Sequence, residues 1–279
     1  MFWLWRTLLQ VLAEPTRDMS AKKWQPWVAL VLPALVCTGM AHAHPAPTLW
    51  GYTGLVNIPT ADLLPDGQVV FGIGYVQRPY GLSRRASYDN ATYYASLGFL
   101  PFLEVNLRVT EIRGYRPHNV GPGYGSEKDR SIGMRLRCYQ RQAQYFTIAV
   151  GIHDPGIESA GFAELSNSLF SALYLVCSKH IARLGLHAGY AVDWLSRQTP
   201  HFSGLFAGLE YEAISWLSAM AEFDTHKVSA GVRCTIALGG KSPTRPGVGQ
   251  PGIRPELGLG IASLGLKKLG GSLHIQLPL

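Results

Sequence analysis

Apolar and polar residues alternate with a period of two over most of the chain from Gln68 onward. From Leu103 to Thr110 every second side chain is apolar, and the residues between them are Glu, Asn, Arg and Thr. Residues 131–138 and 228–236 repeat this pattern. An amphipathic helix would instead place its apolar residues at spacings of three and four. The pattern therefore predicts β-strands with one apolar and one polar face.

Further segments follow the same rule, some of them more weakly: 68–78, 92–99, 144–153, 168–178, 181–193, 203–211 and 215–224. Together they predict about ten strands, each close to the length that crosses a bilayer at a tilt. The connections between them alternate between long and short, as do the extracellular loops and periplasmic turns of outer-membrane barrels. We therefore expect an all-β, antiparallel transmembrane outer-membrane β-barrel. Its N-terminus would lie in the periplasm, and the 114–130 and 154–167 loops would lie outside.

The end of the chain leaves two strand counts open. Residues 238–255 are rich in Gly and Pro and are interpreted as a linker, and alternation resumes at 257–261 and 273–277. In one alternative the barrel is complete at 67–237 and residues 238–279 are a linker and C-terminal tail. In the other, the tail supplies two extra strands, which gives twelve. We favour ten, because the linker is long for a periplasmic turn and the chain ends in Leu279 where an aromatic residue is expected.

Composition supports an exported membrane protein. Of the 279 residues, 47% are hydrophobic and 15% are charged, well below the usual charged content of about 25%. The net charge of +7 comes without a run of Lys or Arg, so no nucleic acid partner is expected. Residues 1–43 read as a signal peptide with a basic start, an apolar core and the cleavage site Ala41-His42-Ala43. Met19 is an alternative start, because residues 1–18 add nothing to export.

The polar face of the strands carries charged residues that would be costly against lipid, so they must face the lumen. These putative lumen charges are Glu104, Arg108, Arg135, Arg137, Glu210, Glu222 and Arg233. We expect them to form internal ion pairs that fill a narrow or closed lumen. The same face is rich in Gly, which suits a strongly curved barrel with a crowded interior.

Residues 44–66, between the signal peptide and the first strand, neither alternate nor show a helical period, and are interpreted as a periplasmic segment or plug motif. Asp66-Gly67 predicts the turn that starts the first strand. The segment carries the motif Gly51, Thr53, Gly54, Leu55, Pro59, Thr60, Ala61, Asp66 and Gly67. This motif resembles the opening of the YjbH/GfcD/WbfB-like outer-membrane proteins encoded with exopolysaccharide and capsule genes.

The resemblance extends over residues 48–237 and includes Leu97–Pro101, Glu104, Arg108 and Val228–Arg233. It implies a single outer-membrane barrel that serves polysaccharide production or export. The larger C-terminal region of the long family members has no counterpart here. The strand at 228–236 also ends in Cys234-Thr235-Ile236, where the family ends it with aromatic residues.

Catalytic chemistry is a weaker interpretation. His153 and Asp154, with Glu158 and Glu164 nearby, are the best candidates for acid–base work, but polar residues are also expected where a strand opens a loop. Glu210, Glu222 and Asp224 could suggest paired carboxylates, which internal ion pairs explain equally well. Aromatic residues that could stack on sugars are Trp50, Tyr52, Tyr80, Tyr88, Tyr115, Tyr124 and Trp194. No catalytic residue, metal site or cofactor is predicted.

The sequence therefore predicts an outer-membrane barrel that takes part, without catalysing a reaction, in exopolysaccharide or capsule production or export. Its expected partners are outer-membrane lipid, polysaccharide and other exopolysaccharide-secretion proteins. The alternatives are an outer-membrane enzyme acting on lipid or glycan near His153 and Asp154, and a narrow passive porin.

Overall fold

The computed structural model describes residues 45–80, 88–113, 126–141, 146–155, 171–193, 202–238 and 255–279. The predicted signal peptide at 1–43, the alternative start at Met19 and most of the linker at 238–255 lie outside these ranges. Within them the chain forms strands that are named here in order: β1 (Gln68–Val76), β2 (Asp89–Gly98), β3 (Leu103–Arg113), β4 (Ser126–Arg141), β5 (Phe146–His153), β6 (Ala172–Ile181), β7 (Leu184–Val192), β8 (Gly204–Ile214), β9 (Leu217–Phe223), β10 (Val228–Ala237), β11 (Glu256–Leu264) and β12 (Lys268–Pro278).

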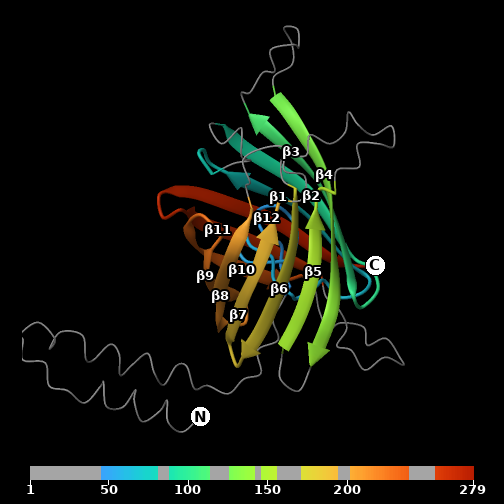
Figure 1. Cartoon of the computed structure of the whole chain (residues 1–279). Coiled ribbons are helices and arrows are strands. Elements are labelled where there is room, and N and C mark those ends of the chain that lie inside the picture. The colour runs from blue at the N-terminus through green and yellow to red at the C-terminus, as the bar shows by residue number, and fades with distance from the viewer. Residues whose placement is uncertain are drawn as a thin grey trace, which may run out of the picture. The chain divides into compact units, whose positions relative to one another are not determined.

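The strands form one closed antiparallel barrel in which each is paired with its sequence neighbours (Figure 1). The ring closes where β1 pairs with β12, in a register that runs from Gln68 opposite Pro278 to Val76 opposite Gly270. Closure removes the unpaired strand edges that would otherwise expose backbone groups. The all-β antiparallel barrel expected from the alternation is thus confirmed.

The described residues form twelve strands, the larger of the two numbers that the sequence left open. The favoured alternative, ten strands with a C-terminal tail, is wrong because β11 and β12 complete the ring between β10 and β1. The length of the linker was the misleading cue. The entropic cost of closing a loop rises only slowly with its length, so a long connection is compatible with strand pairing. The alternation at 257–261 and 273–277 was the better guide.

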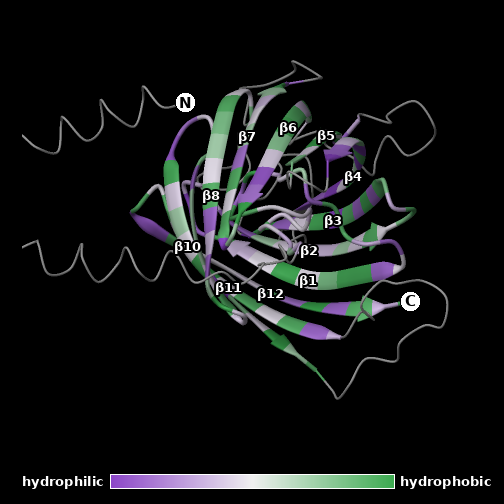
Figure 2. Ribbon diagram, turned by 90° about the horizontal axis from the view of Figure 1, so that it is seen from below, coloured by the Kyte–Doolittle hydropathy of each residue, from purple (hydrophilic) through white to green (hydrophobic). Residues whose placement is uncertain are grey.

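Hydrophobic and hydrophilic residues form alternating bands along the strands (Figure 2). The outer face is apolar, whereas the inner face carries polar side chains together with buried apolar ones such as Val176 and Phe206. In β3 the side chain of Leu107 is 52% exposed, whereas Glu104 is 1% and Arg108 is 4% exposed. Large apolar side chains are exposed around the barrel, among them Phe71, Leu107, Ile132, Leu175, Leu205, Val232, Leu259 and Leu273. So large an apolar outer surface is stable only against an apolar surrounding, as in a transmembrane barrel.

Residues 45–66, here called the plug segment, fill the barrel interior. Their blue trace in Figure 1 lies within the ring of strands. Trp50, Tyr52, Leu55 and Ile58 belong to the largest fully buried side chains, and they pack into the main apolar cluster of the interior. Two isolated bridges, Pro47 with Thr53 and Gly54 with Pro59, are the β-pairings of the segment. Most of its backbone groups must therefore find partners on the wall.

The plug segment joins the barrel at the turn Asp66-Gly67, directly before β1. Gly67 has φ of 72°, a left-handed conformation that glycine adopts without steric cost. Asp66 Oδ1 accepts a hydrogen bond from the backbone N–H of Leu100 at 2.8 Å, and Gly67 O accepts one from Leu279 N at 2.7 Å. These bonds tie the start of the barrel both to the β2–β3 turn and to the end of the chain. No helix in the described ranges is long and apolar enough to cross a membrane.

Candidate functional site: the plug segment and the wall residues that hold it

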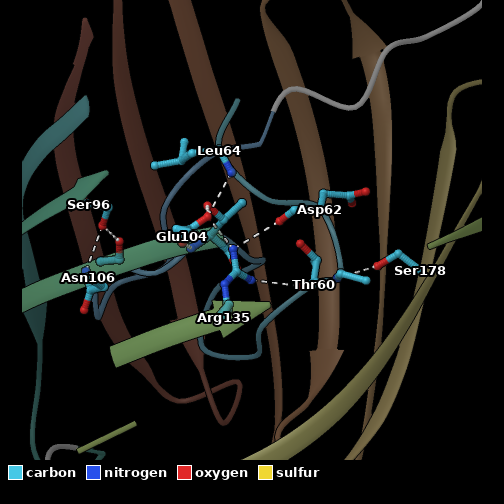
Figure 3. Close-up of polar contacts among 11 residues, drawn as sticks. Thr60, Asp62, Leu64, Ser96, Glu104, Asn106, Arg135 and Ser178 are labelled. Carbon is cyan, nitrogen blue, oxygen red and sulfur yellow. Dashed lines mark hydrogen bonds and ion pairs between the residues drawn. The ribbon is translucent and has the colours of Figure 1, made fainter. Parts of the chain in front are cut away.

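Glu104, near the start of β3, accepts hydrogen bonds from two distant parts of the plug segment (Figure 3). Its carboxylate receives the backbone N–H of Thr53 at 3.1 Å, the Thr53 hydroxyl at 2.8 Å and the backbone N–H of Leu64 at 2.9 Å. Bonds to a charged acceptor are shorter and stronger than neutral ones. A single wall side chain therefore brings the middle and the end of the plug segment together.

Arg135 on β4 lies directly opposite Glu104 in the strand register, and its Nη2 is 2.6 Å from Glu104 Oε2 (Figure 3). The same guanidinium donates to the carbonyl oxygens of Thr53 and Thr60 at 2.7 Å each, and to that of Asp62 at 3.1 Å. A guanidinium carries five N–H donors in a fixed fork, so it can serve several acceptors at once. The Glu104–Arg135 pair thus binds both the donors and the acceptors of the plug backbone.

Glu222 on β9 receives the turn of the plug segment at 56–58. Its carboxylate accepts the backbone N–H groups of Val56 at 3.0 Å, Asn57 at 2.8 Å and Ile58 at 3.2 Å. The Asn57 side-chain amide donates a further bond at 2.9 Å. Successive backbone N–H groups that converge in this way form an anion-binding concavity, so they compensate the burial of the carboxylate.

Arg233 on β10 binds carbonyl oxygens of the same part of the plug segment. Its Nη2 donates to Leu55 O at 2.8 Å and Gly54 O at 2.9 Å, with Pro47 O at 3.4 Å. Its Nη1 lies 3.6 Å from Glu210 Oε1, and that oxygen also accepts the Ser218 hydroxyl at 2.7 Å. The guanidinium therefore links the plug segment to a carboxylate on β8.

Two smaller contacts hold the rest of the segment. Ser178 Oγ on β6 accepts the Ala61 N–H at 2.7 Å and lies 2.7 Å from His187 Nδ1. Asp62 Oδ2 is 3.0 Å from His180 Nε2. Burial acts to raise the pKa of Asp62, but the hydrogen bond and charge of His180, together with the charges of His187 and Arg135, lower it below its ordinary value.

Two wall glycines allow the plug backbone to approach closely. A Cβ atom added to Gly74 on β1 would lie 1.9 Å from the carbonyl oxygen of Leu49, and one added to Gly98 on β2 would lie 2.0 Å from that of Pro65. Both distances are far below van der Waals contact. Inward-facing glycine here reflects the space taken by the plug segment as well as the curvature of the barrel.

The predicted lumen charges divide into those that contact the plug backbone and those that do not. Four of them hydrogen-bond to the plug backbone: Glu104, Arg135, Glu222 and Arg233. Glu210 instead forms an ion pair with Arg233. Arg108 pairs with Asp129 at 3.8 Å and lies 5.9 Å over the Trp50 ring.

Within the described ranges, Arg137 makes no hydrogen bond to the plug segment, although its charge interacts with that of Asp62. It is half-buried beside a register shift that interrupts the alternation of β4, and its Nη1 donates to Gln140 at 3.0 Å. The expectation that the charges chiefly pair with one another across the lumen is therefore only partly met. Glu222 and most of the donors of Arg233 are turned to the plug backbone instead.

The residues of the N-terminal motif all lie in the plug segment or in the turn that follows it. Thr53, Gly54, Leu55, Thr60 and Ala61 hydrogen-bond to wall side chains through their backbones. The carbonyl of Gly51 accepts the Ser96 hydroxyl. Pro59 forms the bridge to Gly54, and Asp66 and Gly67 form the turn. Most motif residues therefore contact the wall, alongside plug residues outside the motif such as Asn57 and Leu64.

His153 and Asp154 lie in a packed interior. The His153 ring stacks on Tyr52, with centroids 4.2 Å apart, and lies 4.8 Å from the Tyr174 ring. Both residues are buried, and Asp154 N donates to Ile132 O at 2.8 Å. Glu158 and Glu164 lie outside the described residues. In the ranges that the structure describes, no group of three His, Cys, Asp or Glu is placed to hold a metal ion.

Sequence reasoning missed Ser178, Asn57 and Asp62 as contacts of this site. Ser178 sits on the inner phase of its strand, so the alternation could have indicated it. The aromatic candidates Trp50 and Tyr52 are fully buried in the plug segment and cannot meet a glycan there. Tyr80 and Tyr88 pack partly buried against the same apolar cluster. Tyr115, Tyr124 and Trp194 fall beyond the described part of the chain.

Comparison with known proteins identifies related chains. The family model YjbH, described as exopolysaccharide biosynthesis protein YbjH, matches residues 47–232 of the 279. The "Uncharacterized lipoprotein YjbH" of Escherichia coli strain K12 is 29% identical over 152 residues, which are 52% of this chain and 19% of that protein. The chain thus matches only a small part of this relative's length.

Two solved outer-membrane barrels are similar in structure at low sequence identity. A KdgM porin has a TM-score of 0.41 at 8% identity, covering 76% of this chain and 99% of the porin. Outer membrane phospholipase A from Escherichia coli has a TM-score of 0.38 at 11% identity, covering 75% and 90%. The family match runs from Pro47 to Val232, over more than half of the chain, and includes most of the plug segment with Glu104, Arg135 and Glu222, so the chain belongs to the YjbH family of exopolysaccharide biosynthesis proteins.

Proposed function

We propose that this protein is a non-enzymatic outer-membrane component of exopolysaccharide or capsule production or export, and that its barrel is kept closed by the plug segment. Membership of an exopolysaccharide biosynthesis family supports the pathway. The apolar outer surface and the closed antiparallel ring support the membrane location, because only a closed ring satisfies every strand edge in lipid. The Gram-negative outer membrane is the bilayer that commonly holds such barrels.

The observation that carries the proposal is the set of hydrogen bonds between the barrel wall and the plug segment. Wall side chains bind backbone groups of the family motif and also of plug residues outside it. Glu104, Arg135, Glu222 and Arg233 come from four strands and converge on a single segment. The arrangement therefore specifies a plugged barrel. It assigns the buried polar groups to holding backbone, which leaves them poorly placed to meet a substrate.

The decisive experiment removes the gene from the producing organism and measures cell-bound and released polysaccharide. We expect a clear loss of polymer, which the wild-type gene restores. Normal polymer in the deletion strain would overturn the assignment to this pathway. Outer-membrane fractionation with heat-modifiable migration on a gel checks the location, and recovery of the protein in the soluble fraction would contradict it.

A second comparison tests the non-enzymatic role. His153→Phe keeps an aromatic ring against Tyr52, and Asp154→Asn keeps the shape of the carboxyl group, so the pair removes acid–base chemistry with little change in packing. At equal surface level, the double variant should support the same polymer output as the wild type. Loss of output with a normally folded barrel would favour the enzyme instead.

A further inference from the structure

A shallow cleft opens at the end of the barrel where the short β6–β7 and β8–β9 turns lie. Its volume is about 50 Å³, and its lining includes Arg183, Glu210, Glu212, Trp216 and Arg233. Enclosed small-molecule sites commonly hold about 300–1,000 Å³, so a ligand here would lie largely across the mouth of the cleft. In the orientation expected from the loop lengths, these turns face the periplasm. A polymer leaving the cell would therefore meet this end of the barrel first.

The rim of the cleft is held by hydrogen bonds between a turn and the neighbouring strand. Glu212 N donates to Arg183 O at 3.0 Å, and Thr235 N donates to Trp216 O at 2.9 Å. Arg183 Nη1 also donates to the Ala213 carbonyl at 3.0 Å. The side chains that line the cleft are thus presented by a fixed backbone, which lowers the cost of ordering them when a ligand binds.

The lining of the cleft contains equal numbers of Arg and Glu residues. Two guanidinium groups, Arg183 and Arg233, are matched by two carboxylates, Glu210 and Glu212. The Glu210 carboxylate is occupied by Arg233 and Ser218. Among the described residues the Glu212 carboxylate has no side-chain partner, so it can accept hydrogen bonds from a ligand. A balanced set of charged groups suits a ligand with many hydroxyl groups better than a strongly charged one.

Trp216 adds a large apolar surface beside these polar groups. It lines the cleft, and 50% of its surface is exposed. Sugar rings combine an apolar face of C–H groups with a rim of hydroxyls, so an indole beside a carboxylate and a guanidinium fits their two kinds of surface. The competing role of Trp216 is to anchor the barrel at the membrane interface, where Trp is common.

We propose that this cleft binds a sugar unit of the polysaccharide, with Trp216 against the apolar face of the ring and with Glu212 and Arg183 bonded to its hydroxyls. The inference rests on the proposed function, which supplies the polymer and the orientation. The cleft also borders the plug segment, because Arg233 binds plug carbonyls and His180 binds Asp62. A sugar bound here would lie next to the groups that hold the barrel closed.

The test measures binding by the purified full chain in detergent micelles, using isothermal titration with short oligosaccharides cut from the polysaccharide of the producing cells. The variants are Trp216→Ala and Glu212→Gln. Phe102→Ala is the matched control, because Phe102 is 47% exposed and lies in the β2–β3 turn at the same end of the barrel. Trp216→Ala should weaken binding about threefold to tenfold, since aromatic contacts contribute about 0.5–1.5 kcal/mol.

Glu212→Gln should weaken binding to a similar or smaller extent, and Phe102→Ala should leave it unchanged. Absence of binding by the wild type would overturn the proposal, as would equal weakening by Trp216→Ala and Phe102→Ala, which would indicate an interfacial role. The two proposals fail separately. A deletion strain that loses polymer while the purified barrel binds no sugar rejects the cleft alone, whereas a deletion strain with normal polymer rejects the proposed function.

Discussion

The plug segment is held by two carboxylate–guanidinium anchors that differ in how their charges are compensated. In the first, Glu104 and Arg135 are cross-strand partners with a direct contact of 2.6 Å. In the second, Glu222 lies opposite Ser229 and Arg233 lies opposite Ser218, so the two charges are offset along β9 and β10. Glu222 is then compensated by four donors of the plug segment, and Arg233 by its carbonyls and Glu210.

This difference indicates separate roles for the two anchors. The first pair keeps its mutual compensation whether or not the plug segment is present, so it belongs to the wall as much as to the closure. The second depends on the plug segment, because its removal would leave Glu222 without its backbone donors. Burying a charge without partners is costly, so the second anchor destabilises the state in which the plug segment has left the lumen. Substitutions in the two anchors should therefore have different consequences.

The largest effect is expected from Arg135→Met. It leaves the buried Glu104 carboxylate without its partner and leaves the carbonyls of Thr53 and Thr60 without a donor. Removing one member of a buried ion pair costs about 3–5 kcal/mol. The free energy of unfolding in detergent or lipid vesicles measures the loss. The double variant Glu104→Gln/Arg135→Met should recover part of it, and a strictly additive double variant would show that the two charges do not compensate each other.

Glu222→Ala should cost somewhat less in global stability but should release the plug segment more. It removes the acceptor of three successive backbone N–H groups, and a buried donor left without a partner costs about 1–3 kcal/mol. Water can replace part of this, because the barrel wall stays intact. Protease cleavage within 45–66 and channel conductance in planar bilayers measure the release. If Arg135→Met opened the barrel more readily than Glu222→Ala, the assignment of roles would be reversed.

Gly74→Ala tests the closeness of the plug segment to a wall strand that belongs to neither anchor. The added methyl group would meet the Leu49 carbonyl, and such overpacking costs about 1–3 kcal/mol. Gly271→Ala on β12 is the matched control, because its Cβ would lie 3.4 Å from the nearest atom, an ordinary contact. Unfolding midpoints of the two variants should differ clearly, and equal midpoints would place the plug segment farther from β1.

The smallest effect concerns pH and the Asp62–His180 contact. The pKa of Asp62 is lowered because the positive groups around it, His180 first among them, together outweigh the effect of burial, so the ionised carboxylate contributes stability at pH values above the ordinary carboxyl pKa. That contribution is lost as the pH falls through the lowered pKa of the folded state. Protease protection of the plug segment should therefore decline in acid more in the wild type than in Asp62→Asn. An identical acid profile in both proteins would exclude this contribution.

Much of the barrel could be predicted from the sequence, because the alternation reports the environment of each side chain directly. Glu104 and Arg108 face inward and Leu107 outward, as the period of two requires. The strand count could not be settled in the same way. Whether β11 and β12 join the ring depends on pairing with β10 and β1, a long-range relation that the linker conceals.

Arg137 shows a second limit of the pattern. It keeps the inner phase in the sequence, yet the register shift beside it ends the alternation, and local composition carries no signal of that shift. The contacts of the plug segment are a third limit. They are mostly hydrogen bonds from wall side chains to backbone atoms, and any residue offers backbone N–H and C=O groups. The identity of residues 55–58 therefore could not indicate Glu222 or Arg233 as their partners.

The sequence by itself determined that this chain forms amphipathic strands, which face of each strand is apolar, and that its N-terminal motif belongs to the YjbH family. These properties depend on side-chain type and spacing, which the sequence states outright. Only the tertiary structure decided that the ring closes with twelve strands, that the motif lies inside it, and that the wall charges bind its backbone. These properties depend on which distant groups meet. A buried charge is costly unless it has a partner, and the fold determines which partner lies close enough to form a bond.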